Sequence, residues 1–294
     1  MEYIVLDLEW NSVYFKPQNR FINEIIQIGA VKLNSALEII DVFQSTVRSA
    51  VSKKLSNRVI SLTGITNEQM LSGVSFRDAV KAYNEWVGED AITMTWSNSD
   101  LYAIVENSRT FLTKNETLKI TKYLDLQSYI QAELRILGFQ ITNQISLANA
   151  AELLNISTDK FDLHTARDDA FVCALMFKNC FNENKIGDFI KDTTESSFYD
   201  RLFFKPYCII NLNDKRINKN HLKFECNNCS KAMNRLKRWK QKNNWFRSEF
   251  YCENCNITNK CMVSFKQTYD KVVVKKRMLP IKSAQDTSED MAMQ

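Results

Sequence analysis

Two Cys-x2-Cys pairs constrain the fold of this chain more than any other feature. Cys226 and Cys229 form the first pair, Cys252 and Cys255 form the second, and 22 residues separate the two pairs. Each pair can bring two thiolates to one tetrahedral metal ion, as structural zinc sites require. The spacing predicts a small C-terminal zinc-ribbon domain with one structural Zn²⁺. Four thiolate ligands leave no open coordination position, so a catalytic zinc is not expected.

The other cysteines lack this pattern, and the chain holds eight in all. Cys261 and His221 are possible substitute zinc ligands, but we do not expect them to bind the ion. Three further cysteines are expected to be small core residues: Cys173, Cys180 and Cys208. The first ten residues, MEYIVLDLEW, show neither a basic region nor a small-residue cleavage site. Thiols without a secretory signal indicate a reducing compartment, so we expect a cytoplasmic protein.

The net charge of +5 is divided unevenly along the chain. Residues 1–213 carry a net charge of −5, residues 214–282 carry +13, and residues 283–294 carry −3. A concentrated basic segment that contains Trp and Phe is typical of nucleic-acid binding. We therefore expect phosphate contacts and base stacking from a set of residues between or beside the cysteine pairs: Arg235, Lys237, Arg238, Trp239, Lys240, Trp245 and Arg247.

An alternative reading of the aromatic residues in this segment stays open. A domain this small needs core residues, and its Trp and Phe side chains could form that core instead of a stacking surface. The rest of the composition is ordinary for a folded protein, with 45% apolar residues. No apolar run approaches the roughly 18 residues that span a bilayer, so no membrane partner is expected.

Alternating strand and helix patterns predict an α/β domain at the N-terminus. Strands are expected over 3–9, 24–33, 38–47, 91–96 and 119–124, and the longest helix over 165–181. The first three strands form a meander, which makes the five-stranded sheet mixed. The predicted organisation is a catalytic-type domain over 1–183, a helical linker over 184–205, the basic ribbon over 206–282 and a disordered acidic tail over 283–294.

Acidic residues gather at three places in the predicted α/β domain. Asp7 and Glu9 lie two residues apart on the first strand, so both side chains point to the same face. Two buried carboxylates are unfavourable side by side unless a cation neutralises them. Asp100 follows the fourth strand at the start of a helix, a common position for a site residue in α/β folds, although alone it would more often be a helix cap.

The third place is the start of the long helix. His164 stands five residues before Asp169, and the small residues Ala166 and Ala170 would let this helix approach the sheet closely. Asp169 is then expected to face inward and Asp168 outward. Four carboxylates and one His suit phosphodiester hydrolysis with two metal ions, in which Mg²⁺ takes carboxylate oxygens and a His takes a proton from water.

These pieces together resemble the DEDDh 3′–5′ exonucleases, a family that includes the bacterial proofreading subunit, RNase T and oligoribonuclease. The matching residues are Asp7-Leu8-Glu9, Asp100 and His164 to Asp169, which have the family's H-x4-D spacing. Residues 23–33 look like the family's second strand, and residues 55–66 look like its segment near the substrate 3′ end. Within the family, the chain is most similar to the branch of the three-prime histone-mRNA exonuclease and the KinA-pathway inhibitor. This judgement rests on the position of residues 43–48 (FQSTVR) before the segment 62–66 (LTGIT).

The resemblance implies an RNase H-like fold, dependence on two Mg²⁺ or Mn²⁺ ions and release of 5′-mononucleotides. It implies that Asp7 bridges both metal ions. Glu9 and Asp169 would then complete the ligands of the first ion, and Asp100 would hold the second ion. His164 is then the general base. The terminal nucleotide is expected to be bracketed by the backbone of Leu8 and by a short segment: Leu62, Thr63, Gly64 and Ile65.

We therefore predict a 3′–5′ exonuclease that acts on single-stranded nucleic acid with a free 3′ end, with RNA favoured over DNA and with the ribbon capturing the substrate. The alternative is an inactive exonuclease fold that serves as a nucleic-acid-binding or scaffold protein. In that case the ribbon would dock onto a protein complex. The sequence identifies no protein partner.

Overall fold

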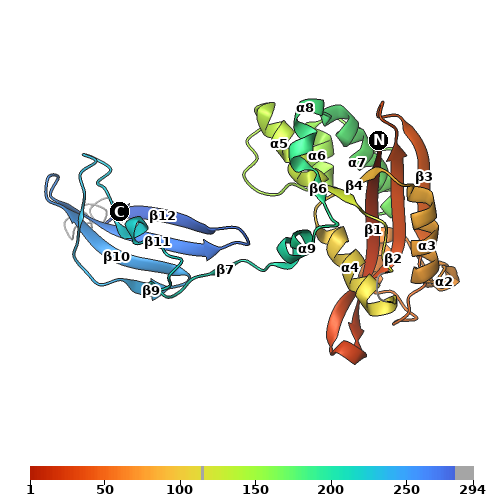
Figure 1. Ribbon diagram of the computed structural model, residues 1–294, viewed down its shortest axis with the longest axis horizontal. Helices are drawn as coiled ribbons and strands as arrows, with labels where there is room; N and C mark the ends of the chain where they lie inside the picture. The colour runs from red at the N-terminus through yellow and green to blue at the C-terminus, as the bar shows by residue number, and fades with distance from the viewer. Residues whose placement is uncertain (114–115, 282–294) are drawn as a thin grey trace, which may run out of the picture. The chain divides into compact units, whose positions relative to one another are not determined.

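The computed structural model describes residues 1–113 and 116–281. The chain divides into two compact units between Tyr199 and Asp200. We describe each unit by itself (Figure 1). The predicted tail over 283–294 lies outside the described residues. Within the described ranges, no helix has both the length and the apolar character needed to cross a membrane.

The first unit is built on a mixed sheet of six strands in the order β3-β2-β1-β4-β5-β6. The strands β1, β2 and β3 pair antiparallel, β1–β4 and β4–β5 pair parallel, and β6 pairs antiparallel with β5. The strands are β1 (Glu2–Phe15), β2 (Arg20–Leu33), β3 (Ile39–Thr46), β4 (Ala91–Thr95), β5 (Lys122–Asp125) and β6 (Lys191–Asp192). The prediction of five strands was one short, because β6 comes from the segment that we expected to be a linker.

Helices cover this sheet. A buried cluster joins α5, α6 and α7 to the strands through residues such as Tyr3, Val5, Met94 and Phe177. The long helix α7 packs against β1 and β2, and α4 packs against β2. The helices of the first unit are α1 (Asn57–Thr63), α2 (Asn67–Ser72), α3 (Phe76–Val87), α4 (Ser99–Phe111), α5 (Leu126–Ile136), α6 (Leu147–Leu153), α7 (Ala166–Cys180) and α8 (Glu183–Phe189), with a 3-10 turn at Lys16–Gln18.

The segment 184–205 is not a simple linker. Ile186 of α8 is buried in the core of the first unit, and Lys191 pairs with Tyr123 across β6 and β5. Residues 184–199 therefore belong to the first unit, because they bury apolar surface and extend its sheet. The division between the units falls within α9 (Ser196–Phe203) instead.

The first two strands are longer than predicted. They continue past Glu9 as a two-stranded hairpin that projects beyond the other strands (Figure 1), with Tyr14 still paired to Phe21. A two-stranded hairpin is marginally stable alone. Here Asn107 of α4 supports it, since its Oδ1 accepts from the amide of Ile25 at 3.0 Å and its Nδ2 donates to the carbonyl of Asn23 at 2.7 Å.

The second unit is a small antiparallel sheet in the order β12-β11-β10-β8, with β7 paired to β11 and β9 paired to β10. Its core contains the apolar side chains Phe224, Phe246, Phe250 and Phe265 together with buried cysteines. The elements are β7 (Tyr207–Cys208), β8 (Asn234–Arg235), β9 (Lys240–Lys242), β10 (Trp245–Cys252), β11 (Ile257–Gln267), β12 (Val272–Pro280) and a 3-10 turn at Lys219–Leu222.

Candidate active site and zinc site

A close approach between α7 and β2 positions the acidic residues. A Cβ added to Gly29 would lie 2.3 Å from the carbonyl carbon of Ala166, so only glycine lets the start of α7 come this near. Gln27 fixes the same contact, because its Oε1 accepts from the amide of Ala166 at 3.0 Å. Gly29 pairs with Asp7 and Gln27 pairs with Glu9 across the ladder. The strand positions that receive the helix therefore lie directly beside the two carboxylates.

This arrangement brings three of the four predicted carboxylates together. Ligand oxygens of Asp7, Glu9 and Asp169 all lie within 4.8 Å of one another, a geometry that can hold a metal ion. Asp100, in the first turn of α4, is only 4% exposed. Its charge acts on Asp7, and its own carboxylate is hydrogen bonded to the backbone of Leu8. The structure thus places Asp100 beside the cluster, next to the strand that carries Asp7.

Burial and mutual repulsion disfavour ionisation of these carboxylates. Burial raises the pKa of Asp7 well above its usual range, and the charges of Asp100, Asp169 and Glu9 raise it further. Burial, then Asp169 and Asp100, raise the pKa of Glu9 to about 8.

The other two carboxylates shift in the same direction. Burial raises the pKa of Asp100 to about 7 against the lowering effect of backbone hydrogen bonds. Burial also raises the pKa of Asp169. Bound cations would supply the missing positive charge, so the donor set fits hard divalent ions such as Mg²⁺ or Mn²⁺.

His164 stands at the edge of this cluster. The residue is exposed and has a φ of 78°, and its amide donates to Asp169 Oδ1 at 3.3 Å. Its charge acts on Asp169, where it lowers the carboxyl pKa. An exposed imidazole beside the carboxylates can exchange a proton with water at the site.

The expectation that Asp168 faces outward was wrong. Asp168 is 6% exposed, and its Oδ2 accepts from the amide of Asp162 at 2.9 Å while its Oδ1 accepts from Arg167 Nε at 2.8 Å. These bonds fix the loop that enters α7. The two acids therefore have different roles. Asp168 holds the loop before α7 in place, and Asp169 faces the carboxylate cluster.

The segment expected near the substrate 3′ end forms the end of α1 and the turn after it. Leu62 is 46% exposed and Gly64 caps the helix with a φ of 67°. Thr63 and Ile65 are buried instead, and the Thr63 hydroxyl accepts from the amide of Ile65 at 3.2 Å. Only Leu62 and Gly64 of this segment are thus open to a ligand. The side chain of Leu8 is buried as well.

The four predicted zinc ligands meet in the second unit. Ligand sulfurs of Cys226, Cys229, Cys252 and Cys255 lie within 4.8 Å of one another. The sulfurs of Cys229 and Cys252 are 3.6 Å apart, close to the ~3.8 Å that a tetrahedron with Zn–S bonds of about 2.3 Å requires. Backbone amides, that of Asn228 foremost, lower the pKa of Cys226 to about 7. None of these four cysteines forms a disulfide, and this donor set fits a structural Zn²⁺.

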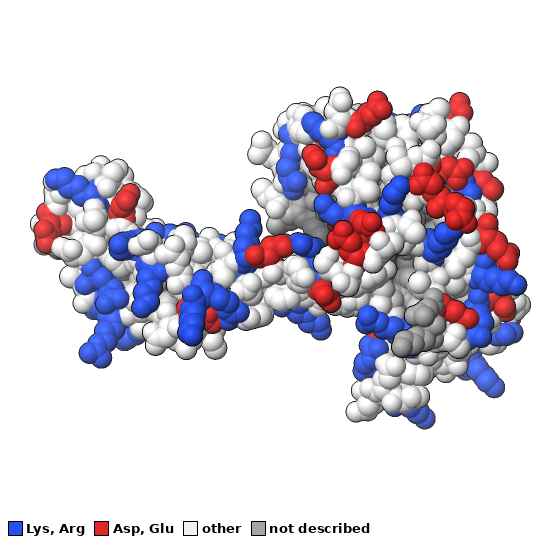
Figure 2. Space-filling model, viewed as in Figure 1, with Lys and Arg blue, Asp and Glu red and all other residues white. Residues whose placement is uncertain are grey.

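Six basic residues of the second unit line a groove. On the face of this unit drawn in Figure 2, blue Lys and Arg side chains outnumber red Asp and Glu side chains. The groove is lined by Lys237, Arg238, Lys240, Lys242, Arg247, Ser248, Glu249 and Lys260. One of its cations is neutralised, since Lys237 pairs with Glu249 at 2.6 Å. The buried Nε of Arg247 has no hydrogen-bond partner among the described residues. Arg235 in β8 is exposed but does not line this groove.

The two tryptophans of the segment differ. Trp239 packs against Phe224 and Phe250 at the core of the ribbon. This packing favours a structural role for Trp239 over stacking on a nucleic-acid base. Trp245 is half-buried outside that cluster, and the guanidinium of Arg277 lies 5.1 Å from the centre of its ring. Cys261 is fully buried in the same core and lies outside the ligand set.

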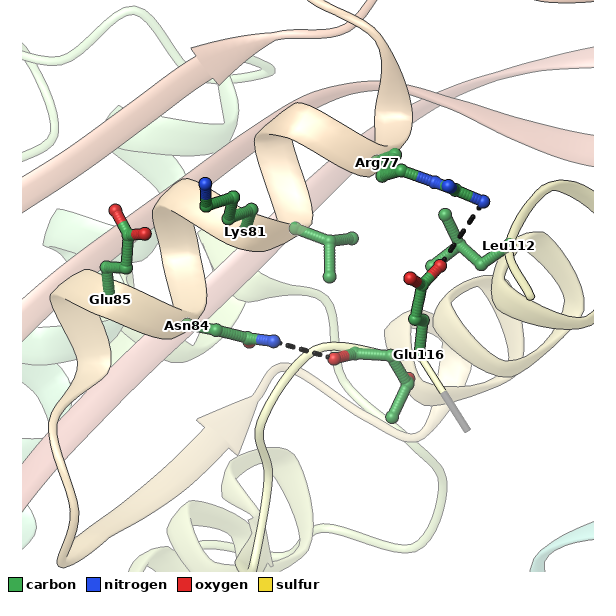
Figure 3. Close-up of a pocket in the computed structure, with 8 residues that line it drawn as sticks. Arg77, Lys81, Asn84, Glu85, Leu112 and Glu116 are labelled. Atoms are coloured by element: carbon green, nitrogen blue, oxygen red, sulfur yellow. Dashed lines mark hydrogen bonds and ion pairs between the residues drawn. The ribbon is translucent and has the colours of Figure 1, made fainter. Parts of the chain in front are cut away.

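A cavity of about 480 Å³ lies between α3 and the residues after α4 (Figure 3), and we assign no function to it. Three of its polar side chains, those of Arg77, Asn84 and Glu116, are already paired. Arg77 contacts Glu116 at 3.3 Å, and Asn84 Nδ2 donates to the carbonyl of Thr117 at 2.9 Å. None of the predicted site residues lines it.

The Exonuclease family (RNase_T) matches residues 4–177 of this chain. The chain is 34% identical over 107 residues to the probable 3′-5′ exonuclease KapD of Bacillus subtilis, which covers 35% of this chain and 51% of KapD. It is 41% identical over 84 residues to human 3′-5′ exoribonuclease 1, which covers 28% of this chain and 24% of that protein. The match therefore spans about half of KapD and about a quarter of the exoribonuclease.

Two solved structures share the fold. The nuclease domain of 3′hExo, a DEDDh family member bound to rAMP, gives a TM-score of 0.51 at 22% identity and covers 64% of this chain and 92% of that chain. Cell-death related nuclease 4 gives a TM-score of 0.51 at 16% identity and covers 74% of this chain and 70% of that chain. The predicted α/β fold of the DEDDh type is thereby confirmed.

Proposed function

The chain belongs to the RNase_T exonuclease family, and we propose that it is a metal-dependent 3′–5′ exonuclease acting on single-stranded nucleic acid. One observation carries the proposal: half-buried carboxylates from β1 and α7 meet beside the buried Asp100 of α4, where their mutual repulsion resists ionisation. A fold that gathers acids at this cost is expected to hold cations there. RNA is favoured as substrate, because the human relative is named an exoribonuclease.

The acidic side chains have distinct positions in the proposed reaction. Asp7, Glu9 and Asp169 would hold one divalent ion, and Asp7 with Asp100 would hold the other. Two such ions stabilise charge on the attacking and leaving oxygens of a phosphodiester. Leu62 and Gly64 are the exposed residues of the segment proposed to contact the terminal nucleotide.

His164 is the proposed general base. Its ring is exposed at the edge of the cluster, and the positive φ at this residue sets the direction in which it leaves the loop. A neutral imidazole can accept a proton from the attacking water. The adjacent carboxylate of Asp169 would stabilise the imidazolium that forms.

The test uses an unlabelled RNA oligonucleotide and the DNA of the same sequence. We expect 5′-mononucleotides from the wild-type protein in Mg²⁺ or Mn²⁺, faster from RNA, and none in EDTA. Release of 3′-mononucleotides, or degradation unaffected by EDTA, would contradict the proposal. Binding of the oligonucleotide without degradation would favour the alternative, an inactive fold used as a scaffold.

We further propose that the ribbon holds the substrate through its basic groove. Lys240 and Arg247 line this groove, and neither forms an ion pair with a carboxylate within the described part of the chain. Converting both to Gln should weaken binding of single-stranded RNA and flatten its salt dependence by about 1–2 in the slope of log K against log salt.

The control removes the same charge outside the groove, with Lys219→Gln and Lys271→Gln, and should change binding less. Equal effects of the two double variants would indicate a general charge effect. No effect of either would favour a ribbon that docks onto a protein.

A further inference from the structure

The turn that leads into α4 is strained. β4 ends at Thr95, α4 begins at Ser99, and Ser97 between them has a φ of 87°. A residue other than glycine adopts this backbone region only when its surroundings hold it there. At the start of the helix the N-cap residue Asn98 makes no side-chain capping bond, and the Ser97 hydroxyl accepts from the amide of Ser99 at 3.3 Å.

Two buried hydroxyls hold this turn by the carbonyl of Ser97. Thr95 Oγ1 donates to that carbonyl. Tyr123 Oη lies 3.1 Å from the same oxygen and 2.7 Å from Thr95 Oγ1. Thr95 is fully buried and Tyr123 is 2% exposed, so no water competes strongly for these bonds. Tyr123 reaches the turn from β5, the neighbouring parallel strand.

The direction of this turn determines where Asp100 lies. Asp100 comes three residues after Ser97, and its carboxylate is buried against the backbone of Leu8 and beside Asp7. A change at Ser97 would rotate the first turn of α4 and move that carboxylate relative to β1. We propose that Tyr123 is a positioning residue for the divalent-cation site, acting through the Ser97 turn on Asp100. This inference rests on the proposed function in one respect, since that function identifies the bound ligand as a divalent cation.

The test is Tyr123→Phe, which removes the hydroxyl and keeps the ring. Binding of Mn²⁺ to the full-length protein is measured by electron paramagnetic resonance, together with kcat and KM. We expect about a tenfold loss of Mn²⁺ affinity, as for other residues that orient a metal ligand. At low Mn²⁺ the variant should show a reduced kcat that excess Mn²⁺ restores, with KM for the oligonucleotide unchanged.

Tyr129→Phe is the matched control. Tyr129 is also fully buried in the first unit, and its hydroxyl donates to the carbonyl of Cys180 at 2.9 Å and accepts from the amide of Asn182 at 2.8 Å. Its loss should lower the Tm and leave Mn²⁺ affinity at the wild-type value. An unchanged Mn²⁺ affinity in Tyr123→Phe, or an equal loss in both variants, would overturn the positioning role.

The outcomes for the wild-type protein separate this role from the proposed function. A wild-type protein that binds Mn²⁺ without degrading nucleic acid contradicts the function alone, and the comparison of Mn²⁺ affinities still decides the role of Tyr123. A wild-type protein that binds no Mn²⁺ overturns both.

Discussion

Gly29 of β2 lies against Ala166 of α7 so closely that a Cβ on Gly29 would stand 2.3 Å from the carbonyl carbon of Ala166. Gly29 also pairs with Asp7, and Asp169 follows Ala166 by less than one helical turn. The separation between this strand and this helix therefore sets the separation between two of the carboxylates.

Gly29→Ala should push α7 away from the sheet and separate Asp169 from Asp7. We expect a loss of about 1–3 kcal/mol in the free energy of unfolding, typical of overpacking, and a large loss of metal-dependent activity. Denaturant titration and an exonuclease assay in Mn²⁺ measure the two effects. Gly187→Ala is the control, since a Cβ there meets nothing within 4 Å, and it should leave both quantities near the wild-type values. A Gly29→Ala protein with full activity would show that the contact does not position the site.

Asp7→Asn and Asp169→Asn should each abolish hydrolysis and leave the protein folded. Each substitution removes a charged ligand and also relieves repulsion among buried acids, so stability without metal should rise or stay the same. Asp168→Asn distinguishes the neighbouring acids. Because Asp168 bonds the amide of Asp162 and Arg167, we expect a lower Tm with Mn²⁺ affinity retained. If Asp168→Asn loses Mn²⁺ binding as fully as Asp169→Asn, it is wrong to assign Asp168 to the loop and Asp169 to the metal site.

The metal-free protein should lose stability as the pH rises. The pKa of Glu9 is raised from 4.5 to about 8 and that of Asp100 from 3.8 to about 7, so the folded state binds protons more tightly than the unfolded state does. Their contribution to stability is complete below about pH 4 and is lost as the pH rises towards 8. In protein dialysed free of Mg²⁺ and Mn²⁺, with the zinc left in place, the Tm of the first unit should fall on the order of 5 °C between pH 5 and 8, and saturating Mn²⁺ should remove the fall. A Tm of this metal-depleted protein that rises over the same range would contradict the raised pKa values.

His164→Asn tests the general base while keeping the backbone. Asn tolerates a positive φ better than most residues, so the loop and the amide bond to Asp169 should survive. We expect kcat to fall by about 10²–10⁴ with little change in KM. A fall of less than tenfold would remove His164 from the reaction.

Removal of zinc should unfold the second unit selectively. We expect about one zinc per chain by metal analysis, lost in Cys226→Ser and retained in Cys261→Ala, because Cys261 is a core residue outside the ligand set. Circular dichroism should then show the loss of the small sheet, while the helical signal of the first unit persists. Zinc retained by Cys226→Ser would indicate a substitute ligand, for which His221 and Cys261 are the candidates.

The acidic ligands could be predicted from the sequence because each one has a local signal. Asp7 and Glu9 share a strand face by their spacing, and Asp169 stands near the start of the predicted long helix, five residues after His164. The positions that bring them together have no local signal. Gly29 and Gln27 are two residues apart on the second strand, and their roles depend on the pairing register with Asp7 and Glu9. That register depends on a bulge between Glu9 and Trp10, which the sequence does not reveal.

The other differences also come from contacts distant in sequence. Asp168 was expected to face outward because the H-x4-D spacing selects Asp169, yet the amide of Asp162 gives Asp168 a buried partner. Strand β6 has only two residues, too few for a periodic pattern, and forms because β5 offers an unpaired edge. Trp239 has the same neighbours in sequence whether it stacks on a base or fills the core. Only its packing against Phe224 and Phe250 decides between the two.

The most direct measurement of the central claim uses single-stranded RNA labelled at its 5′ end, incubated with the wild-type protein or Asp7→Asn in Mg²⁺. We expect a ladder of labelled products that shorten from the 3′ end with time in the wild-type reaction, and intact RNA with Asp7→Asn. Immediate release of a labelled mononucleotide would show degradation from the 5′ end. That result, or an unchanged ladder with Asp7→Asn, would contradict the account.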